Sequence, residues 1–299
     1  MSSDDRRVGM PRGGRGHAWS LLVLLCILRP SLQATASAAT RPAAVAATAR
    51  PVACGTAGGI DVRGTRLALH GNHTYAHVCV LGGGQLLAAA ALTVRTGLLY
   101  VDASSSIVAD GLPGGQPKTV DCERTGTGKP RGAPGMSFTI FANRATVLGR
   151  IAANGGTGYD GTPSPCTTID GGNGGDGGQI TLEAANLTLR GSIAATGGQG
   201  GDGFTPDPLA DQFFPKGGRA GSGGDGGHIT LLLARPSPPR FAPSLRVAGG
   251  APGTPGDDTC VADGTCKTHG YPGRHGRPGR IVIGTLSTAQ MGALPSPTP

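Results

Sequence analysis

The chain has 299 residues, of which 55 are glycine and 24 are proline, so these two types fill 79 positions. This glycine and proline content indicates a chain of low complexity or of repeated turns, and with only 4% aromatic residues we expect no conventional large core. The formal net charge is +8, but the basic residues are scattered and locally dense only at Arg274, Arg277 and Arg280. With no lysine/arginine run and no nucleic-acid motif, we expect no nucleic-acid partner.

Residues 1–39 have the features of a secretory signal peptide. Arginines precede an apolar core, Ala18 to Leu28, and Ala36-Ser37-Ala38 offers a small-residue cleavage site. The apolar core is short for a bilayer span, so we expect no transmembrane segment in the mature chain. The segment predicts a secreted or cell-surface protein, with a retained amino-terminal anchor as the alternative.

Residues 40–53 form an Ala/Pro-rich linker, and residues 54–98 lack the repeat described below and are predicted to be an N-terminal cap. Within the cap, residues 67–81 suggest a hairpin around Gly71-Asn72. The segment 82–94 fits either a first coil or a short helix. The histidines His70, His73 and His77 fit polar positions around a turn better than a metal site.

A repeat organises residues 99–286. Residues 138–156 align without gaps on residues 180–198, at an offset of 42. A third copy runs from Ile229 to Gly250, a partial fourth from Arg280 to Leu286, and a shortened first copy lies near residues 99–111. Periods of this size indicate stacked structural units. Residues 287–299 are predicted to be a disordered tail.

The apolar residues of each unit alternate with period two, as in Ile180 and Leu182, or Leu187 and Leu189. One short unit cannot bury its apolar face alone, but neighbouring copies can bury it together. We therefore predict an all-β fold, a right-handed parallel β-helix with glycine-rich turns at its corners. A disordered glycine-rich chain is the alternative.

The pattern GGxGGDGGxITLxAxxLTLxGxIxAxGGxGG resembles the repeats of filamentous-haemagglutinin-type adhesins and related autotransporter passengers. The resemblance covers roughly residues 99–286. It implies a secreted parallel β-helix and a role in adhesion or surface display.

Seven cysteines are present, and one of them, Cys26, lies in the signal segment. The other six form an even set, which in an exported chain suggests disulfides. Sequence order suggests the pairs Cys54–Cys79, Cys122–Cys166 and Cys260–Cys266, although other pairings remain open.

The glycine blocks carry the clearest chemical pattern. Residues 197–205, GGQGGDGFT, match the calcium-binding nonapeptide of repeats-in-toxin proteins, and residues 155–163 nearly match it. Stacking would bring Asp160 near Asp202 and Asp176 near Asp225, and carboxylates with glycine carbonyls suit Ca²⁺. We treat calcium at these four aspartates as a hypothesis, because Asp-Gly is also a common metal-free turn pair. No other cofactor is indicated.

The sequence favours a secreted or cell-surface structural or adhesive protein without catalytic activity, with polysaccharide or another cell-surface ligand as its partner. One alternative is a polysaccharide lyase or hydrolase, which the fold prediction alone permits. A second is a glycine-rich cell-wall protein, because GGX runs also form side-by-side extended helices. The strand-like segments ITLEA and LTLRG favour the β fold over that packing.

Overall fold

The computed structural model of the protein describes residues 54–115, 131–162, 170–205, 217–235, 244–257 and 270–295. All of these residues belong to one compact unit. The predicted signal peptide and linker lie outside the described residues. Within the described ranges, no helix combines the length and the apolar character needed to cross a membrane.

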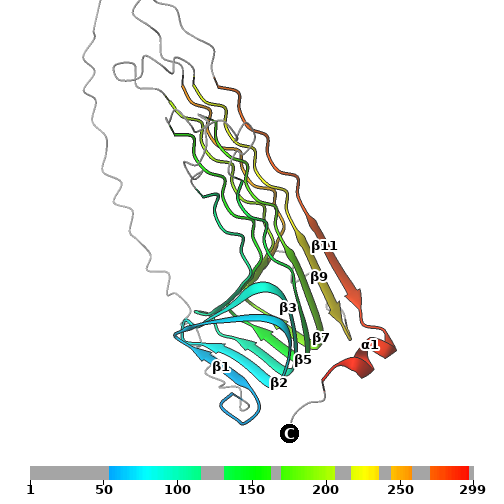
Figure 1. The fold of residues 1–299 in the computed structure, drawn as a ribbon. Coiled ribbons are helices and arrows are strands. Elements are labelled where there is room, and N and C mark those ends of the chain that lie inside the picture. The colour runs from blue at the N-terminus through cyan, green and yellow to red at the C-terminus, as the bar shows by residue number, and fades with distance from the viewer. Residues whose placement is uncertain are drawn as a thin grey trace, which may run out of the picture. The chain divides into compact units, whose positions relative to one another are not determined.

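The described residues contain eleven strands, which pair in parallel within one sheet (Figure 1). The main path runs in the order β10-β8-β6-β4-β3-β5-β7-β9-β11, and β2 joins β1 to β3. The strands are β1 (Ile60–Arg63), β2 (Arg66–Leu81), β3 (Gln85–Val101), β4 (Ser106–Val108), β5 (Phe138–Val147), β6 (Arg150–Ala152), β7 (Gln179–Leu189), β8 (Ser192–Ala194), β9 (His228–Leu233), β10 (Leu245–Arg246) and β11 (Arg280–Thr285).

The repeat sets the register of the sheet. Phe138 of β5 pairs with Ile180 of β7, and Ile180 pairs with Ile229 of β9, so the offset of 42 residues is the pairing offset between β5 and β7. Alternate residues of these strands, among them Leu182 and Leu231, are fully buried. Burial of each such side chain contributes roughly 1.5–3 kcal/mol to the stability of the fold. One copy of the repeat cannot bury these side chains alone, so the burial depends on neighbouring copies.

The predicted right-handed β-helix is wrong, because the strands do not form a solenoid of stacked rungs. Strand β3 pairs with β4 through residues 85–87 and with β5 through residues 92–101. This long strand joins the two limbs into one sheet, which curves until it nearly closes on itself (Figure 1). The prediction failed on the glycine blocks, which were expected to be the corners of a coil.

The glycine blocks do not turn the chain. Among the described residues, glycines with positive φ lie between Gly55 and Gly83, before the first block. The blocks instead leave and re-enter the sheet as extended arms (Figure 1). The outgoing arms follow β4, β6, β8 and β10 and comprise residues 109–115, 153–162, 195–205 and 247–257. The returning arms lead into β5, β7, β9 and β11 and comprise residues 131–136, 170–178, 217–227 and 270–279.

The arms pack in two layers with a three-residue repeat, the period of a polyproline II-type chain. In the X-Gly-Gly triplets of the inner arms, the first glycine donates its N–H to residue X of the next arm in the same layer, as Gly174 does to the Ser222 carbonyl (2.8 Å). The second glycine donates to the opposite layer, as Gly175 does to the Gly156 carbonyl (2.8 Å). Neighbours are parallel within a layer and antiparallel between layers.

Close packing of the arms requires glycine. A Cβ built on Gly198 would lie closer than 3.0 Å to the carbonyl oxygen of Gly156, a separation that real Cβ atoms essentially never show. The same conflict recurs through the inner arms. The chain thus combines two arrangements that the sequence posed as alternatives, parallel strands and side-by-side extended glycine segments.

Prolines occupy the edges of the two layers. In the last outgoing and returning arms, Pro252, Pro255, Pro272 and Pro278 replace the first glycine, whose N–H would face the open edge. In the first arms, Pro113 and Pro134 hold position X, whose N–H would face the other open edge. The described parts of the four inner arms contain no proline. Since proline lacks an N–H, each edge offers few donors to a further chain.

The segment predicted to be a cap is part of the same sheet. Residues 66–81 form the single strand β2 rather than the expected hairpin. Gly71 adopts a φ of +80° where the register between β2 and β3 shifts, so the chain continues past it without reversing. Gly82 and Gly83, also at positive φ, make the turn into β3, so most of segment 82–94 is strand.

A short helix, α1 (Thr288–Ala293), follows β11 within the segment that was expected to be disordered. Ser287 caps its N-terminus, and Gln290 completes a reciprocal capping box. Arg95 of β3 donates a hydrogen bond to the Ala293 carbonyl (3.2 Å). The helix is therefore tied to the outward side of the sheet.

Candidate functional site: the outer faces of the glycine arms

Position X of each triplet carries the side chains that the arms present to solvent. A side-chain oxygen at X in one arm accepts the backbone N–H of X in the next arm of the same layer. Asp176, for example, accepts from the N–H of Asp225 (2.9 Å), and Asp225 accepts from the N–H of Arg277 (2.7 Å). Each of these bonds gives a partner to an N–H that no carbonyl reaches.

Ten such bonds occur in the described arms. In the outgoing layer they join Asp110 to Asn154, Asn154 to Thr196, Asp160 to Asp202, Asp202 to Thr254 and Thr205 to Asp257. In the returning layer they join Asp170 to Arg219, Asn173 to Ser222, Ser222 to Arg274, Asp176 to Asp225 and Asp225 to Arg277. These columns of short polar side chains run from arm to arm across each layer.

The structure brings together the aspartates that the sequence paired, Asp160 with Asp202 and Asp176 with Asp225, each through a side chain-to-backbone bond of 2.9 Å. One carboxylate oxygen of each residue therefore already accepts a backbone N–H. The second oxygen of Asp176 is bonded to Arg131 (2.7 Å). Calcium binding by these residues stays a prediction.

Among the described residues, the only group of three potential ligands close enough to hold one metal ion is Cys54, Asp61 and Cys79. The two cysteines form a disulfide, so their sulfurs are not thiolate ligands. His73 Nε2 donates to the His70 carbonyl oxygen (2.8 Å), and the Tyr75 hydroxyl lies 3.1 Å from His73 Nδ1, while His77 is buried and makes neither contact. The three histidines of β2 thus do not gather into a site.

Sequence reasoning missed Asn154, Asn173, Asp170 and Ser222 as members of the columns. The signal was present, because each stands three residues, or a multiple of three, from one of the four aspartates that we considered as calcium ligands. A search for the triplet period would have found them.

The outer faces of the two layers differ in charge. The outgoing face presents Asp110, Asp160, Asp202 and Asp257 at position X and no basic residue there among the described positions. The returning face presents Asp170, Asp176 and Asp225, together with the basic residues Arg131, Arg219, Arg274, Arg277 and Arg280. The arms therefore display an acidic face and a face in which arginine predominates.

A surface depression of ≈ 430 Å³ lies on the returning face, where its arms join the sheet. Its lining includes the ionisable residues Asp176, Asp225, His228, Arg277 and Arg280. The last arm continues straight into β11 at Arg280, which pairs with His228 of β9. Strand pairing therefore holds these two lining residues side by side.

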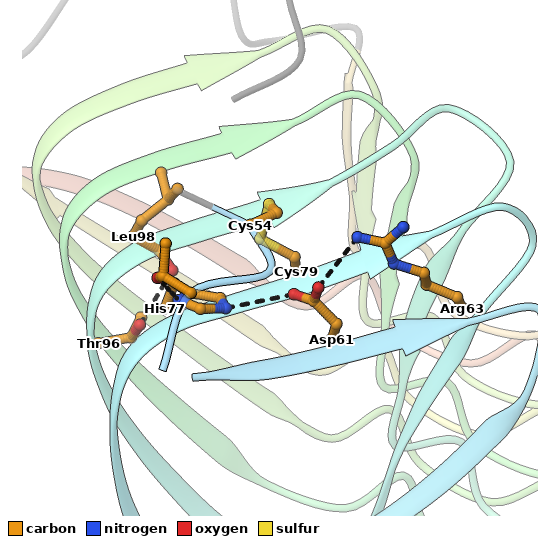
Figure 2. Close-up of a disulfide and its surroundings, with 8 residues drawn as sticks. Cys54, Asp61, Arg63, His77, Cys79, Thr96 and Leu98 are labelled. Carbon is orange, nitrogen blue, oxygen red and sulfur yellow. Dashed lines mark hydrogen bonds and ion pairs between the residues drawn. A yellow bond between two sulfur atoms is a disulfide. The ribbon is translucent and has the colours of Figure 1, made fainter. Parts of the chain in front are cut away.

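The N-terminal strands carry a second polar cluster. Cys54 and Cys79 form a disulfide with a Cα–Cα distance of 6.0 Å, which confirms the first predicted pair (Figure 2). The cysteines of the other two predicted pairs, Cys122, Cys166, Cys260 and Cys266, lie outside the described residues. The bridge fastens the chain before β1 to β2.

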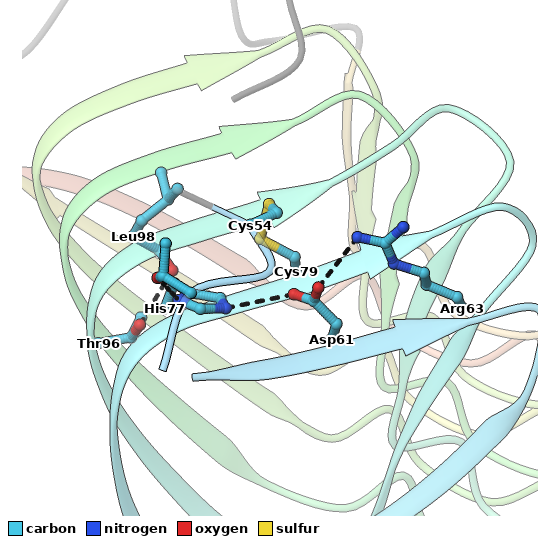
Figure 3. A network of polar contacts seen from close by, with 8 residues as sticks. Cys54, Asp61, Arg63, His77, Cys79, Thr96 and Leu98 are labelled. Carbon is cyan, nitrogen blue, oxygen red and sulfur yellow. Dashed lines mark hydrogen bonds and ion pairs between the residues drawn. A yellow bond between two sulfur atoms is a disulfide. The ribbon is translucent and has the colours of Figure 1, made fainter. Parts of the chain in front are cut away.

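Beside the disulfide, the buried His77 ring lies 3.2 Å from Asp61 Oδ1, and Asp61 Oδ2 binds Arg63 at 3.0 Å (Figure 3). The first contact has ion-pair distance but not hydrogen-bond geometry, since Asp61 Oδ1 has no hydrogen-bond partner among the described residues. Thr56 Oγ1 lies 3.3 Å from His77 Nδ1. The network joins the segment before β1 to β2, and we interpret it as a structural lock.

No known family model matches this chain, and no curated protein or solved structure is similar to it.

Proposed function

We propose that the protein is a secreted or cell-surface structural or adhesive protein that acts without catalysis, through the outer faces of its glycine arms. The observation that carries the proposal is the three-residue register, which presents every X side chain of a layer on one outer face. Successive X residues along an arm stand about 9 Å apart for a rise of 3.1 Å per residue.

The packing of the arms supports a rigid display surface. In most triplets of the inner arms, two N–H groups are bonded to backbone carbonyls of two different arms, and the N–H of residue X is often bonded to a side chain. A surface fixed in this way loses little conformational entropy when a ligand binds, which favours recognition of a ligand with its own regular repeat.

Two observations support an exported protein. The Cys54–Cys79 disulfide is typical of oxidising compartments, and residues 1–39 have the pattern of a signal peptide. Structural or adhesive use outside the cell is consistent with both.

The test is to purify the exported full chain and to measure its adhesion to immobilised polysaccharides and to cells of its source, beside an assay for polysaccharide cleavage. We expect saturable adhesion with no shortening of the polysaccharide. Cleavage that persists in the purified protein would replace the proposal with the enzyme alternative, and absence of adhesion to every surface would refute the adhesive role.

A further inference from the structure

Three arginines follow one another at intervals of three residues. Two stand at X positions of the last returning arm, and the third is the first residue of β11. Arg274, Arg277 and Arg280 are exposed, and their register places all three on the returning face. We call this set the arginine row. For an arm with a rise of 3.1 Å per residue, neighbouring Cα atoms of the row are about 9 Å apart.

The guanidinium groups of the row are available to a ligand. The backbone N–H groups of Arg274 and Arg277 bind Ser222 and Asp225, but none of the three guanidinium groups makes a hydrogen bond or ion pair with another described residue. The nearby Asp176 binds Arg131 instead. The row is therefore positively charged, and the backbone that carries it is fixed.

The surroundings extend the row at both ends. Towards the sheet lie the depression of ≈ 430 Å³ and His228. Towards the tip of the arm lies Tyr271, a residue that is 64% exposed and whose ring has Arg219 over it at 5.0 Å from the ring centroid. An aromatic ring beside a line of cations offers a platform for a sugar ring next to partners for its acidic groups.

We propose that the arginine row binds a linear acidic polysaccharide, an inference that rests on the proposed adhesive function and names its ligand class. Arginine binds carboxylate and sulfate groups with two parallel hydrogen bonds. A spacing of about 9 Å between cations is close to the length of a disaccharide and so suits a polymer with one charge per disaccharide. Each strand of duplex DNA carries one phosphate for every 3.4 Å of helix axis, a higher charge density than the spacing of this row matches.

The experiment measures binding of the exported full chain to hyaluronan, which carries one carboxylate per disaccharide. Dextran serves as the uncharged control, and duplex DNA and phosphatidylserine vesicles as other anionic surfaces. The test variant is R274Q/R277Q/R280Q. The matched control is R66Q/R190Q/R246Q, which removes three exposed arginines elsewhere.

We expect hyaluronan binding that weakens with salt, no dextran binding, and an affinity loss on the order of tenfold or more in the row variant alone. Unchanged thermal melting of both variants verifies folding. Equal losses in both variants, or a preference of the row for DNA or vesicles, would overturn the inference. Adhesion to other surfaces without hyaluronan binding would refute the ligand class alone, whereas cleavage of the polymer would refute the proposed function.

Discussion

The side chain of Asp225 accepts the backbone N–H of Arg277 at 2.7 Å, and the N–H of Asp225 is itself accepted by Asp176 at 2.9 Å. The side chains of the aspartates in the glycine blocks thus accept backbone N–H groups of neighbouring arms. This role needs a side-chain oxygen at a fixed position, but it does not need a negative charge.

Replacing Asp225 therefore separates the acceptor role from a charge-dependent one. We expect Asp225→Ala to lower the free energy of unfolding by about 1 kcal/mol, because one hydrogen bond is lost, and Asp225→Asn to restore most of it. Urea denaturation measures both values. If Asn is as damaging as Ala, and a chelator lowers the melting temperature of the unmodified protein, the carboxylate is a calcium ligand as the sequence first suggested.

The glycines between the layers should not tolerate a methyl group. A Cβ on Gly224 would lie closer than 3.0 Å to the Gly175 carbonyl oxygen, whereas a Cβ on Gly115 would meet nothing within 4 Å. We expect Gly224→Ala to destabilise the protein by about 3 kcal/mol or more and Gly115→Ala to be nearly neutral. Equal melting temperatures for the two variants would show that the layers are not packed this closely.

Loss of the Cys54–Cys79 disulfide should loosen the N-terminal strands. The bridge closes a loop with a sequence separation of 25, for which chain entropy gives a stabilisation of about 3.5 kcal/mol. We expect the Cys54→Ser/Cys79→Ser variant to unfold at lower urea concentration. Hydrogen exchange should quicken first in β1 and β2, and uniform exchange across the sheet would contradict a local role.

Stability should fall in acid partly because of Asp102. Burial alone would raise the pKa of this carboxyl, but the nearby Ser105 hydroxyl and hydrogen bonds from the Gly82 amide and Ser104 lower the pKa overall. The Ser105 hydroxyl falls short of hydrogen-bond geometry, so we assign more weight to the other two donors. A carboxyl whose pKa is lower in the folded state stabilises the fold at pH values above its unfolded pKa, which is about 3.9. This stabilisation is lost as the pH falls through the folded pKa.

We therefore expect Asp102→Asn to flatten the loss of stability below about pH 4. Glu183 provides a control of opposite sign. Burial raises the pKa of Glu183 more than Arg95 lowers it. The contribution of Glu183 to the free energy of unfolding is therefore present at low pH and is lost as the pH rises through the folded pKa. Glu183→Gln should reduce that decline, and urea melts between pH 2 and pH 7 on both variants would measure the two slopes.

The edge prolines should keep the arms of different molecules apart. Replacing Pro252, Pro255, Pro272 and Pro278 by glycine would restore N–H groups along one open edge. We expect this variant to associate as its concentration rises in sedimentation experiments. The control Pro295→Gly, which lies outside the arms, should sediment like the unmodified protein. A quadruple variant that remains unassociated would show that proline is not what protects the edge.

The sequence predicted the strands of the repeat, their parallel pairing and the offset of 42 residues, because the alternation of residues such as Ile180 and Leu182 reports directly on burial. It did not predict the path of the glycine blocks. Glycine permits both a tight turn and a close extended approach, and local sequence does not distinguish them. The spacing of the prolines at residues 252, 255, 272 and 278 was the available sign of a three-residue period, since proline is compatible with an extended chain and with an edge.

The triplet also limits how such a molecule can change in size. Adding one or two residues inside an arm would rotate every later side chain by a third or two thirds of a turn, which would drive polar groups into the space between the layers. Adding three residues would lengthen the arm and leave every later side chain on the same side of the layer. We expect tolerated insertions and deletions in these segments to come in multiples of three, so that the reach of the display surface varies in discrete steps.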